Sequence, residues 1–298
     1  MKLKNILNKT SFTIFFVLIL VTGCKSQNIN FNFSGKKVLY SENIQGKIEL
    51  VLLNLDTNEK IKFNNFDEVE GSTYILFNEG KKIFVSEYNS TGKVYIYDIL
   101  KNAKIEIDIH SKNSDMSDFS EINISNNYFY FASHNKIFAH SLVDFSLVKE
   151  YTVDSLISQF SVHDKDLMAI TYSDFDLDTK CLSISNIYLY NFKDNTKKEI
   201  PFRAYLCDWS NNGEKLLFNS IGPKTMDYPT FEIHSINIDS LEYLIDMSFI
   251  ANDEIIFSGY RSGEDFNSTN LYLLNLKSKK IIQITNSDTR KEIKSTNY

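Results

Sequence analysis

The chain has 298 residues, of which 43% are hydrophobic and 23% charged, proportions typical of a folded globular protein. Gly (10) and Pro (3) are scarce, whereas Phe (23) and Tyr (17) are abundant, so collagen-like and Pro/Gly-rich low-complexity classes are excluded. The formal net charge is −6, and because a nucleic-acid-binding protein needs a basic face, we expect no nucleic-acid partner.

The N-terminus has the pattern of an export signal. Three lysines within the first nine residues precede a run at 12–21 in which only Thr13 is polar. Ten apolar residues are too few to cross a bilayer, since a spanning helix needs about 20, whereas a basic region followed by a short apolar one is typical of a secretory signal. A buried core helix would carry polar residues along one face, and this run has no such polar face. We therefore predict a cleaved signal over residues 1–23.

A cysteine follows the apolar run. The segment Leu20-Val21-Thr22-Gly23-Cys24 resembles the lipobox of bacterial lipoproteins, in which an aliphatic residue and two small residues precede the cysteine. The resemblance implies that Cys24 carries a diacylglyceryl group, becomes the first mature residue and is N-acylated, and two or three acyl chains make a durable membrane anchor. Residues 24–28 would then be a short polar tether. Ordinary signal cleavage that leaves Cys24 as a free thiol is the alternative.

The charge of the mature chain bears on how it meets the membrane. Removal of residues 1–23 takes away three lysines and no acid, so the net charge falls from −6 to −9. Anionic lipid repels such a chain, so we expect the acyl chains on Cys24, and not a basic patch, to provide the membrane contact. Some bacterial groups use an acidic run directly after the cysteine for surface display, and this chain has no such run. We therefore expect a location in the cell envelope on the periplasmic side of an outer membrane.

From residue 29 onward the chain repeats one kind of apolar strand. Each copy is preceded by another strand and followed by a polar turn and a third strand, with a fourth strand upstream. The copies recur at intervals of roughly 39 to 50 residues, a period that indicates propellers or solenoids: Ile48–Leu55, Val94–Ile99, Lys136–Leu142, Ile187–Phe192, Phe231–Ile238 and Leu271–Leu276. We predict an all-β fold, a six-bladed β-propeller of four-stranded antiparallel blades over residues 29–298.

The side chains of these strands favour blades over a two-sheet sandwich. Val94 and Ile96 point to one side of their strand while Tyr95 and Tyr97 point to the other, and both sets are largely apolar. A sheet with one wet face would alternate apolar with polar residues, whereas a propeller blade packs against a neighbour on each side. The many aromatic rings would then fill the wedge-shaped gaps between blades.

Several segments resemble TolB-like six-bladed propellers. Asp208-Trp209-Ser210-Asn211-Asn212-Gly213, followed by Leu217 and Phe218, is similar to that family's Trp-Ser-Pro-Asp-Gly signature. Residues 270–286 are similar to its third and fourth strands with their closing Leu-Thr-Asn. The resemblance implies a fold, and with it the protein–protein contacts in which such domains often act, but it does not imply an activity.

Closure of the ring leaves two arrangements open. Ile29–Phe33 could supply the innermost strand of the first blade, so that residues 290–298 would be surplus. Alternatively, the tail 290–298 supplies that strand and latches the ring. We favour the first arrangement, because the turn at Phe33-Ser34-Gly35 resembles the one that follows Trp209.

Catalytic signatures are absent from the sequence: it contains no Gly-x-Ser-x-Gly elbow, Walker loop, dinucleotide fingerprint or His-Glu-x-x-His. We therefore assign no catalytic residue and expect no cofactor. The best cluster for a metal is Asp174, Asp176 and Asp178, placed in a long connection of the fourth blade, where alternating carboxylates could converge on Ca²⁺. The glycine and glutamate that complete such a loop are replaced by Thr179 and Ser185, which favours a solvated loop.

Cys181 and Cys207 complete the cysteine inventory. Outside the cytoplasm such a pair can form a disulfide, whereas free cysteines are also common small core residues. Both interpretations stay open.

Two longer connections in the fifth and sixth blades attract attention because binding residues concentrate in loops on a rigid scaffold. Residues 222–229 include Asp227 and Tyr228, and residues 260–266 include Tyr260 and Arg261. The strand order predicts that both lie between the second and third strands of their blades, as does the Asp174 loop, so we expect all three on one face of the disc. That face is the predicted binding surface.

Two functions fit these features. The first is a lipid-anchored cell-envelope propeller that binds or scaffolds a protein, peptide or glycan without catalysis. The alternative is a metal-dependent propeller hydrolase or lyase that acts on a small lactone or polysaccharide, which would need acids and histidines to converge at the channel mouth.

Overall fold

The computed structural model describes residues 31–44, 46–63, 66, 72–86, 94–107, 121–125, 127–176, 181–238, 243–261 and 268–297. These residues form twenty-five strands. Among them, no helix has the length and apolar character needed to cross a membrane. The predicted signal over 1–23 and the tether over 24–28 lie outside the described residues.

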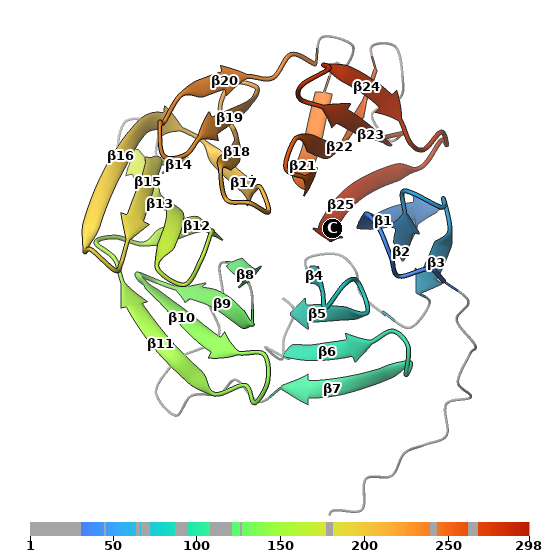
Figure 1. The fold of residues 1–298 in the computed structure, drawn as a ribbon, viewed down its shortest axis with the longest axis horizontal. Helices are drawn as coiled ribbons and strands as arrows, with labels where there is room; N and C mark the ends of the chain where they lie inside the picture. Colours follow the sequence, from blue (N-terminus) through green and yellow to red (C-terminus); the bar gives the residue numbers. More distant parts are fainter. Residues whose placement is uncertain are drawn as a thin grey trace, which may run out of the picture.

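The strands form six antiparallel sheets, arranged as blades around a central axis (Figure 1). From the axis to the rim, blade one contains β25 (Arg290–Asn297), β1 (Lys37–Ile44), β2 (Lys47–Asn54) and β3 (Lys60–Phe63). Blade two contains β4 (Thr73–Phe77), β5 (Lys82–Ser86), β6 (Val94–Asp98) and β7 (Ala103–Ile107). Blade three contains β8 (Glu121–Ser125), β9 (Tyr128–Ser133), β10 (Lys136–Ser141) and β11 (Leu147–Thr152).

The remaining blades follow the same order. Blade four contains β12 (Ile157–Val162), β13 (Leu167–Asp176), β15 (Asn186–Asn191) and β16 (Thr196–Arg203), with β14 (Cys181–Ile184) paired to the far end of β13. Blade five contains β17 (Tyr205–Trp209), β18 (Lys215–Asn219), β19 (Pro223–Asp227) and β20 (Ile233–Ser235). Blade six contains β21 (Tyr243–Ala251), β22 (Glu254–Tyr260), β23 (Asn270–Asn275) and β24 (Lys280–Gln283). The predicted six-bladed, all-β fold is confirmed.

Because neighbouring strands of a blade are antiparallel, successive connections alternate between the two faces of the disc. We call one the turn face: it carries the connections from the inner strand to the second strand and from the third strand to the outer strand. We call the other the crossover face: it carries the connections from the second strand to the third and from each blade to the next. These two names are used below.

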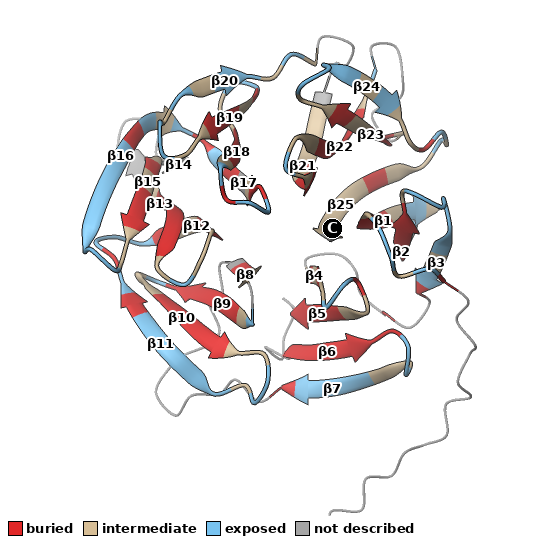
Figure 2. Ribbon diagram, viewed as in Figure 1, coloured by how far each residue is buried: buried red, intermediate tan, exposed pale blue. Residues whose placement is uncertain are grey.

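Burial follows the expectation for blades. All five residues of β6 are buried, although their side chains alternate between two sides, whereas five of the six residues of β11, the outer strand of blade three, are exposed (Figure 2). Aromatic rings fill the space between blades; Phe84 of blade two and Phe129 of blade three have ring centroids 5.1 Å apart. Burial on both sides of each middle strand explains why the sequence is so rich in Phe and Tyr.

The favoured expectation for ring closure is wrong. The tail forms β25, which pairs antiparallel with β1 as the inner strand of blade one, and its Ile293 packs against the core shared with blade six. Phe31–Phe33 form no strand. Instead, Asn32 donates its backbone N–H to Glu59 Oε2 and accepts a hydrogen bond from Asn54 Nδ2, so this segment lies along the turn between β2 and β3. β25 takes the inner position because it pairs with β1 from Lys37 to Asn43, with one bulge between Leu39 and Tyr40, and adds an apolar side chain to the core.

Candidate functional site

The inner strands of all six blades line one channel with a volume of about 1100 Å³. Each strand places polar side chains on it. The polar lining includes Thr73, Asn78, Asn123, Ser125, Gln159, His163, Asp208, Asn219, Asp246, Ser248, Lys294 and Thr296.

Much of this polar lining ties one blade to the next. Ser295 Oγ of blade one accepts a 2.9 Å hydrogen bond from the backbone N–H of Leu76 in blade two. Ser125 Oγ of blade three donates to the carbonyl of His163 in blade four at 3.1 Å. Gln159 Oε1 of blade four accepts from the backbone N–H of Leu206 in blade five at 3.0 Å. Side chains at these positions therefore hold the ring together as well as lining the channel.

Asp208 joins three blades near the turn face. Its Oδ2 accepts a 2.7 Å hydrogen bond from Ser248 Oγ of blade six, and its Oδ1 accepts from the backbone N–H of Trp209 at 2.8 Å. Ser248 Oγ lies 3.0 Å from Thr296 Oγ1 of β25, which donates to the carbonyl of Phe249 at 2.7 Å. Burial raises the pKa of Asp208 to about 6, although the bonds from Ser248 and Trp209 oppose the rise. The pattern is that of a structural clasp.

The turn that follows Asp208 explains the signature found in the sequence. Ser210 accepts a backbone bond from Gly213 at 2.7 Å, and Gly213 has a φ of +68°, which favours glycine. Trp209 Nε1 donates to the carbonyl of Ser161 in blade four at 3.2 Å. The ring of His163 packs on Trp209 with centroids 5.2 Å apart. Trp, Ser and Gly in this pattern therefore close a tight turn and attach blade five to blade four.

Asp246 lies in the same channel, where its carboxyl accepts a hydrogen bond from the backbone of Ile293 in β25. Its contact with Ser258 Oγ, at 3.5 Å, is at the limit of a hydrogen bond. Burial raises the pKa of Asp246 to about 6, the neighbouring Glu292 adds to the rise, and Lys294 opposes it. Glu292 is itself paired with Arg290 at 2.8 Å and with Lys294 at 3.2 Å. A partly exposed carboxyl with a raised pKa is a mark of functional sites, and Asp246 is the channel residue that fits it best.

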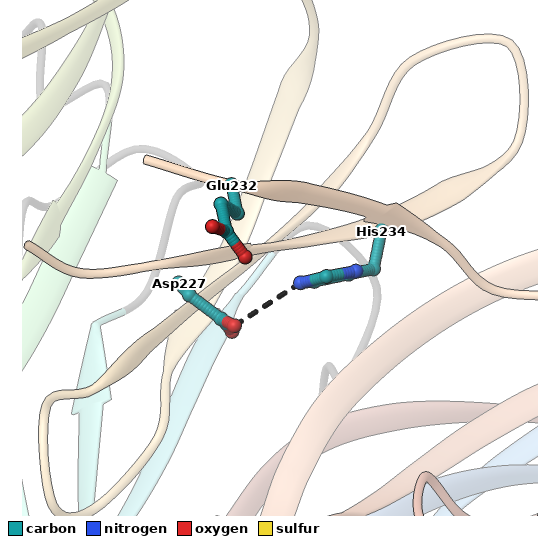
Figure 3. Close-up of side chains that lie close together, drawn as sticks. All are labelled: Asp227, Glu232 and His234. Carbon is teal, nitrogen blue, oxygen red and sulfur yellow. Dashed lines mark hydrogen bonds and ion pairs between the residues drawn. The ribbon is translucent and has the colours of Figure 1, made fainter. Parts of the chain in front are cut away.

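A group of potential metal ligands lies at the rim of blade five. Ligand atoms of Asp227, Glu232 and His234 all lie within 4.8 Å of one another, because the hairpin of β19 and β20 brings them to one side (Figure 3). His234 Nε2 is 3.1 Å and Lys215 Nζ 2.8 Å from the carboxylate of Asp227. Burial alone would raise the pKa of Asp227, but hydrogen bonds from Lys215 and His234 lower it on balance. The ammonium of Lys215 already neutralises the carboxylate that a cation would need.

Exposed apolar side chains gather at the crossover face in blades four and five. Tyr205, which begins β17, is 59% exposed, and Ile221, between β18 and β19, is fully exposed at 105%. Leu156, which precedes β12, is 47% exposed. Tyr205 also lines the channel. We call these three residues the mouth group.

The predicted binding residues do not share a face. Tyr260 ends β22 and Arg261 follows it at the crossover face, as expected. Asp227 ends β19 and Tyr228 follows it, so both belong to the turn face. The expectation of one common face is wrong because Pro223–Asp227, interpreted as part of a loop, is the third strand of blade five. The segment Phe231–Ile238 then contains the outer strand, β20, rather than the third one.

The other predicted residues lie partly outside the described structure. Asp174 and Asp176 belong to β13 and pair with β14, so they are in a strand and not in a loop. Asp178 lies outside the described residues, as do the side chains of Asp174, Asp176, Cys181 and Cys207. Calcium binding and the disulfide between Cys181 and Cys207 stay predictions, as does the lipidation of Cys24.

Sequence reasoning missed Asp246 and the ligand group around His234. Asp246 is isolated in the sequence. Its position beside β25 depends on how the ring is closed, and the expectation for closure was wrong. Glu232 and His234 are two apart, a spacing that places both side chains on one side of a strand, and this was the available signal.

Comparisons with known proteins give a fold. No family model matches the sequence, and no curated protein matches it. The structure is similar to that of TolB from Acinetobacter baumannii, with a TM-score of 0.64 and 17% identity over 89% of this chain and 67% of that one. A chain of the nidogen/laminin complex gives a TM-score of 0.59 at 10% identity, over 88% of this chain and 97% of that one.

A third structure differs in an instructive way. The β-propeller domain of the Trilobed protease from Pyrococcus furiosus gives a TM-score of 0.53 at 14% identity, over 85% of this chain and 83% of that one, and is described as having an open velcro topology. Here β25 and β1 pair and close the ring. At these identities the likeness extends to the fold: the chain is a six-bladed β-propeller similar to that of TolB.

Proposed function

We propose that the protein is a lipid-anchored cell-envelope propeller that binds a protein partner at the crossover face. The mouth group carries the proposal. Two large apolar side chains and a tyrosine, all at least 47% exposed, lie on this face, and the tyrosine, Tyr205, lines a channel of about 1100 Å³. Exposed tyrosine and aliphatic residues beside a concave site are typical of recognition surfaces.

The channel itself supports binding rather than chemistry. The side chains of Ser125, Gln159, Asp208 and Ser295 contact neighbouring blades, and hence form a rigid frame behind the mouth group. A rigid frame lowers the entropy cost of binding, because the loops that meet the partner are already positioned. A peptide or glycan partner would use the same mouth.

Capture from the native envelope tests this proposal. The tagged protein is crosslinked in its own envelope and recovered, alongside Tyr205→Ser and Ile221→Ser variants. If the mouth group contacts the partner, each variant should lower partner recovery by about tenfold, the loss typical of a central contact residue. Val148→Ser is the matched control, since Val148 is 52% exposed on the outer strand β11 and is not part of the mouth group. Equal recovery by all variants would contradict the proposal.

Anchoring is tested separately. Mass spectrometry of the membrane-extracted protein should show a mature chain that begins at acylated Cys24. The Cys24→Ser variant should move from the membrane fraction to the soluble one, because the mature chain carries a net charge of −9 and no compensating basic patch is expected. An uncut leader or an unmodified thiol would refute the anchor.

A metal-dependent activity is the second candidate, and the group at Asp227, Glu232 and His234 favours it. Two carboxylates and an imidazole suit a divalent cation, with Lys215 as a competitor. Purified protein would be assayed for bound metal and for a thermal shift on chelation, with His234→Gln as control. A stoichiometric ion lost in that variant would support the hydrolase or lyase; an unchanged melting curve in the presence of Zn²⁺ or Ca²⁺ would count against it.

A further inference from the structure

The described chain begins at the turn face of blade one. Asn32 is bonded to Asn54 and to Glu59, which flank the turn between β2 and β3. Lys36 donates its backbone N–H to Asp56 Oδ2 at 3.1 Å in the same turn. Since this turn joins the third strand to the outer strand, it lies on the turn face. Any anchor upstream of residue 31 therefore pulls on that face.

The distance from the anchor to this point is limited. Eight residue steps separate Cys24 from Asn32, and an extended chain covers at most about 3.6 Å per step, so the reach is at most about 29 Å. The eight-residue strands β1 and β2 span about 26 Å from one face to the other at about 3.3 Å per residue. A tether that ran to the crossover face would use almost all of its length of about 29 Å to extend along the blade, which is about 26 Å long. The turn face is the one that the anchor can hold close to a bilayer.

The turn face exposes apolar side chains where the tether meets the disc. Leu100, in the turn between β6 and β7, is 49% exposed, and it follows Ile99, which is buried in the same cluster as Phe31. Val143, in the turn between β10 and β11 of the neighbouring blade, is 83% exposed. Leu147 continues this edge at 46%. All lie in connections from a third strand to an outer strand, or directly beside one.

We propose that the turn face of blades two and three rests on the lipid bilayer, with Leu100 and Val143 inserted at the level of the headgroups. The proposal rests on the proposed lipid anchor at Cys24. Single apolar turns bind bilayers weakly, but an anchor that holds them near the surface makes the second contact effectively intramolecular. The mature chain carries a net charge of −9, so apolar contact, and not attraction to anionic headgroups, stabilises the turn face on the bilayer. The mouth group then points away from the membrane.

Quenching by brominated lipid tests this orientation. Lipidated full-length protein is incorporated into phosphatidylethanolamine/phosphatidylglycerol vesicles whose acyl chains carry bromine, which quenches tryptophan on contact. Three variants each add one tryptophan: Leu100→Trp and Val143→Trp on the turn face, and Ile221→Trp as the matched control on the crossover face. The emission of Trp209, which is buried and common to all, is subtracted.

The added emission of Leu100→Trp and Val143→Trp should fall by about half in brominated relative to unbrominated vesicles, while that of Ile221→Trp stays unchanged. Quenching of Ile221→Trp alone, or of none of the three in protein that sediments with the vesicles, would overturn the orientation and leave the anchor intact. A blue shift without quenching would show that a second copy covers these turns, and would also overturn it. Protein that fails to sediment, with Cys24 unmodified, would refute the anchor and the orientation together.

Discussion

The two ends of the channel differ in how firmly they are built. Near the turn face, Asp208 accepts two short hydrogen bonds, and the following turn is packed against blade four through Trp209. Toward the crossover face, Asp246 has a serine contact of 3.5 Å, and Tyr205 and Ile221 stand exposed. Both carboxyls have a raised pKa, so the pKa alone does not separate them. Their hydrogen bonds differ: Asp208 accepts a 2.7 Å side-chain bond from blade six, whereas Asp246 is bonded by the backbone of Ile293 and only at 3.5 Å by the side chain of Ser258.

The largest effect is expected from Gly213→Ala. Gly213 has a φ of +68°, and an added Cβ would meet the ring of His163, whose displacement would disrupt its packing on Trp209. We expect a loss of about 3 kcal/mol in the free energy of unfolding, measured in urea. Gly46→Ala, at the crossover face, is the control: its φ is +83° but an added Cβ meets nothing within 4 Å, so about 1 kcal/mol is expected. Equal losses of unfolding free energy in the two variants would contradict the inference that the turn after Trp209 is packed more tightly than the turn at the crossover face.

Asp208→Ala should be the next most damaging change. It removes the acceptor of the 2.7 Å bond from Ser248 and of the 2.8 Å bond from the backbone N–H of Trp209, which should cost about 2 kcal/mol of unfolding free energy. Asp208→Asn keeps one of the two bonds and should lie between this variant and the wild type. Chemical denaturation at pH 7 measures both. A loss no larger than that of a surface substitution would show that Asp208 is not a clasp.

Asp246→Asn is expected to act in the opposite direction. The pKa of Asp246 is about 6 in the folded protein, above its ordinary value of 3.8, so the folded state binds more protons between these two pH values. Stability therefore falls as pH rises through this window and stays lower above it. Asparagine has no proton to lose, and after allowance for solvent screening in the channel the variant should gain about 1 kcal/mol at pH 7. The gain should vanish near pH 4; a gain independent of pH would contradict the burial argument.

Ile221→Ser should change stability least. Ile221 is fully exposed, so its replacement should alter the free energy of unfolding by less than about 0.5 kcal/mol. Thermal unfolding measures any contribution of Ile221 to stability, and the partner-capture assay measures its contribution to binding. Substantial destabilisation would mean that the crossover end is as structural as the turn-face end.

The fold could be predicted because its signal is local and repeated. The strand at Val94–Ile99 shows apolar residues on both sides, and four of the five segments that repeat it are likewise third strands of their blades. The fifth, Phe231–Ile238, contains the outer strand β20 instead. Ring closure could not be predicted in the same way. Phe33-Ser34-Gly35 has the turn chemistry of an inner-strand connection, but the choice between that segment and the tail is made by the ladder of β25 on β1.

The site depends on contacts that no local pattern contains. Asp208 and Ser248 are 40 positions apart, and they meet because inner strands of consecutive blades converge on one axis. Pro223 was interpreted as a loop residue, yet it begins β19, where a missing N–H is tolerated at the first position of a strand. This misplacement moved Asp227 and Tyr228 to the wrong face.

The position of β25 has a consequence for biogenesis. The strand that completes blade one is the last of the described strands, so β1 presents an unpaired edge until β25 has been synthesised and has folded onto it. A chain shortened at its C-terminus retains that open edge permanently, and an open edge invites pairing with other chains. Completion of the ring therefore depends on β25: full-length chains cover the edge of β1, whereas chains that lack β25 leave this edge accessible to proteolysis.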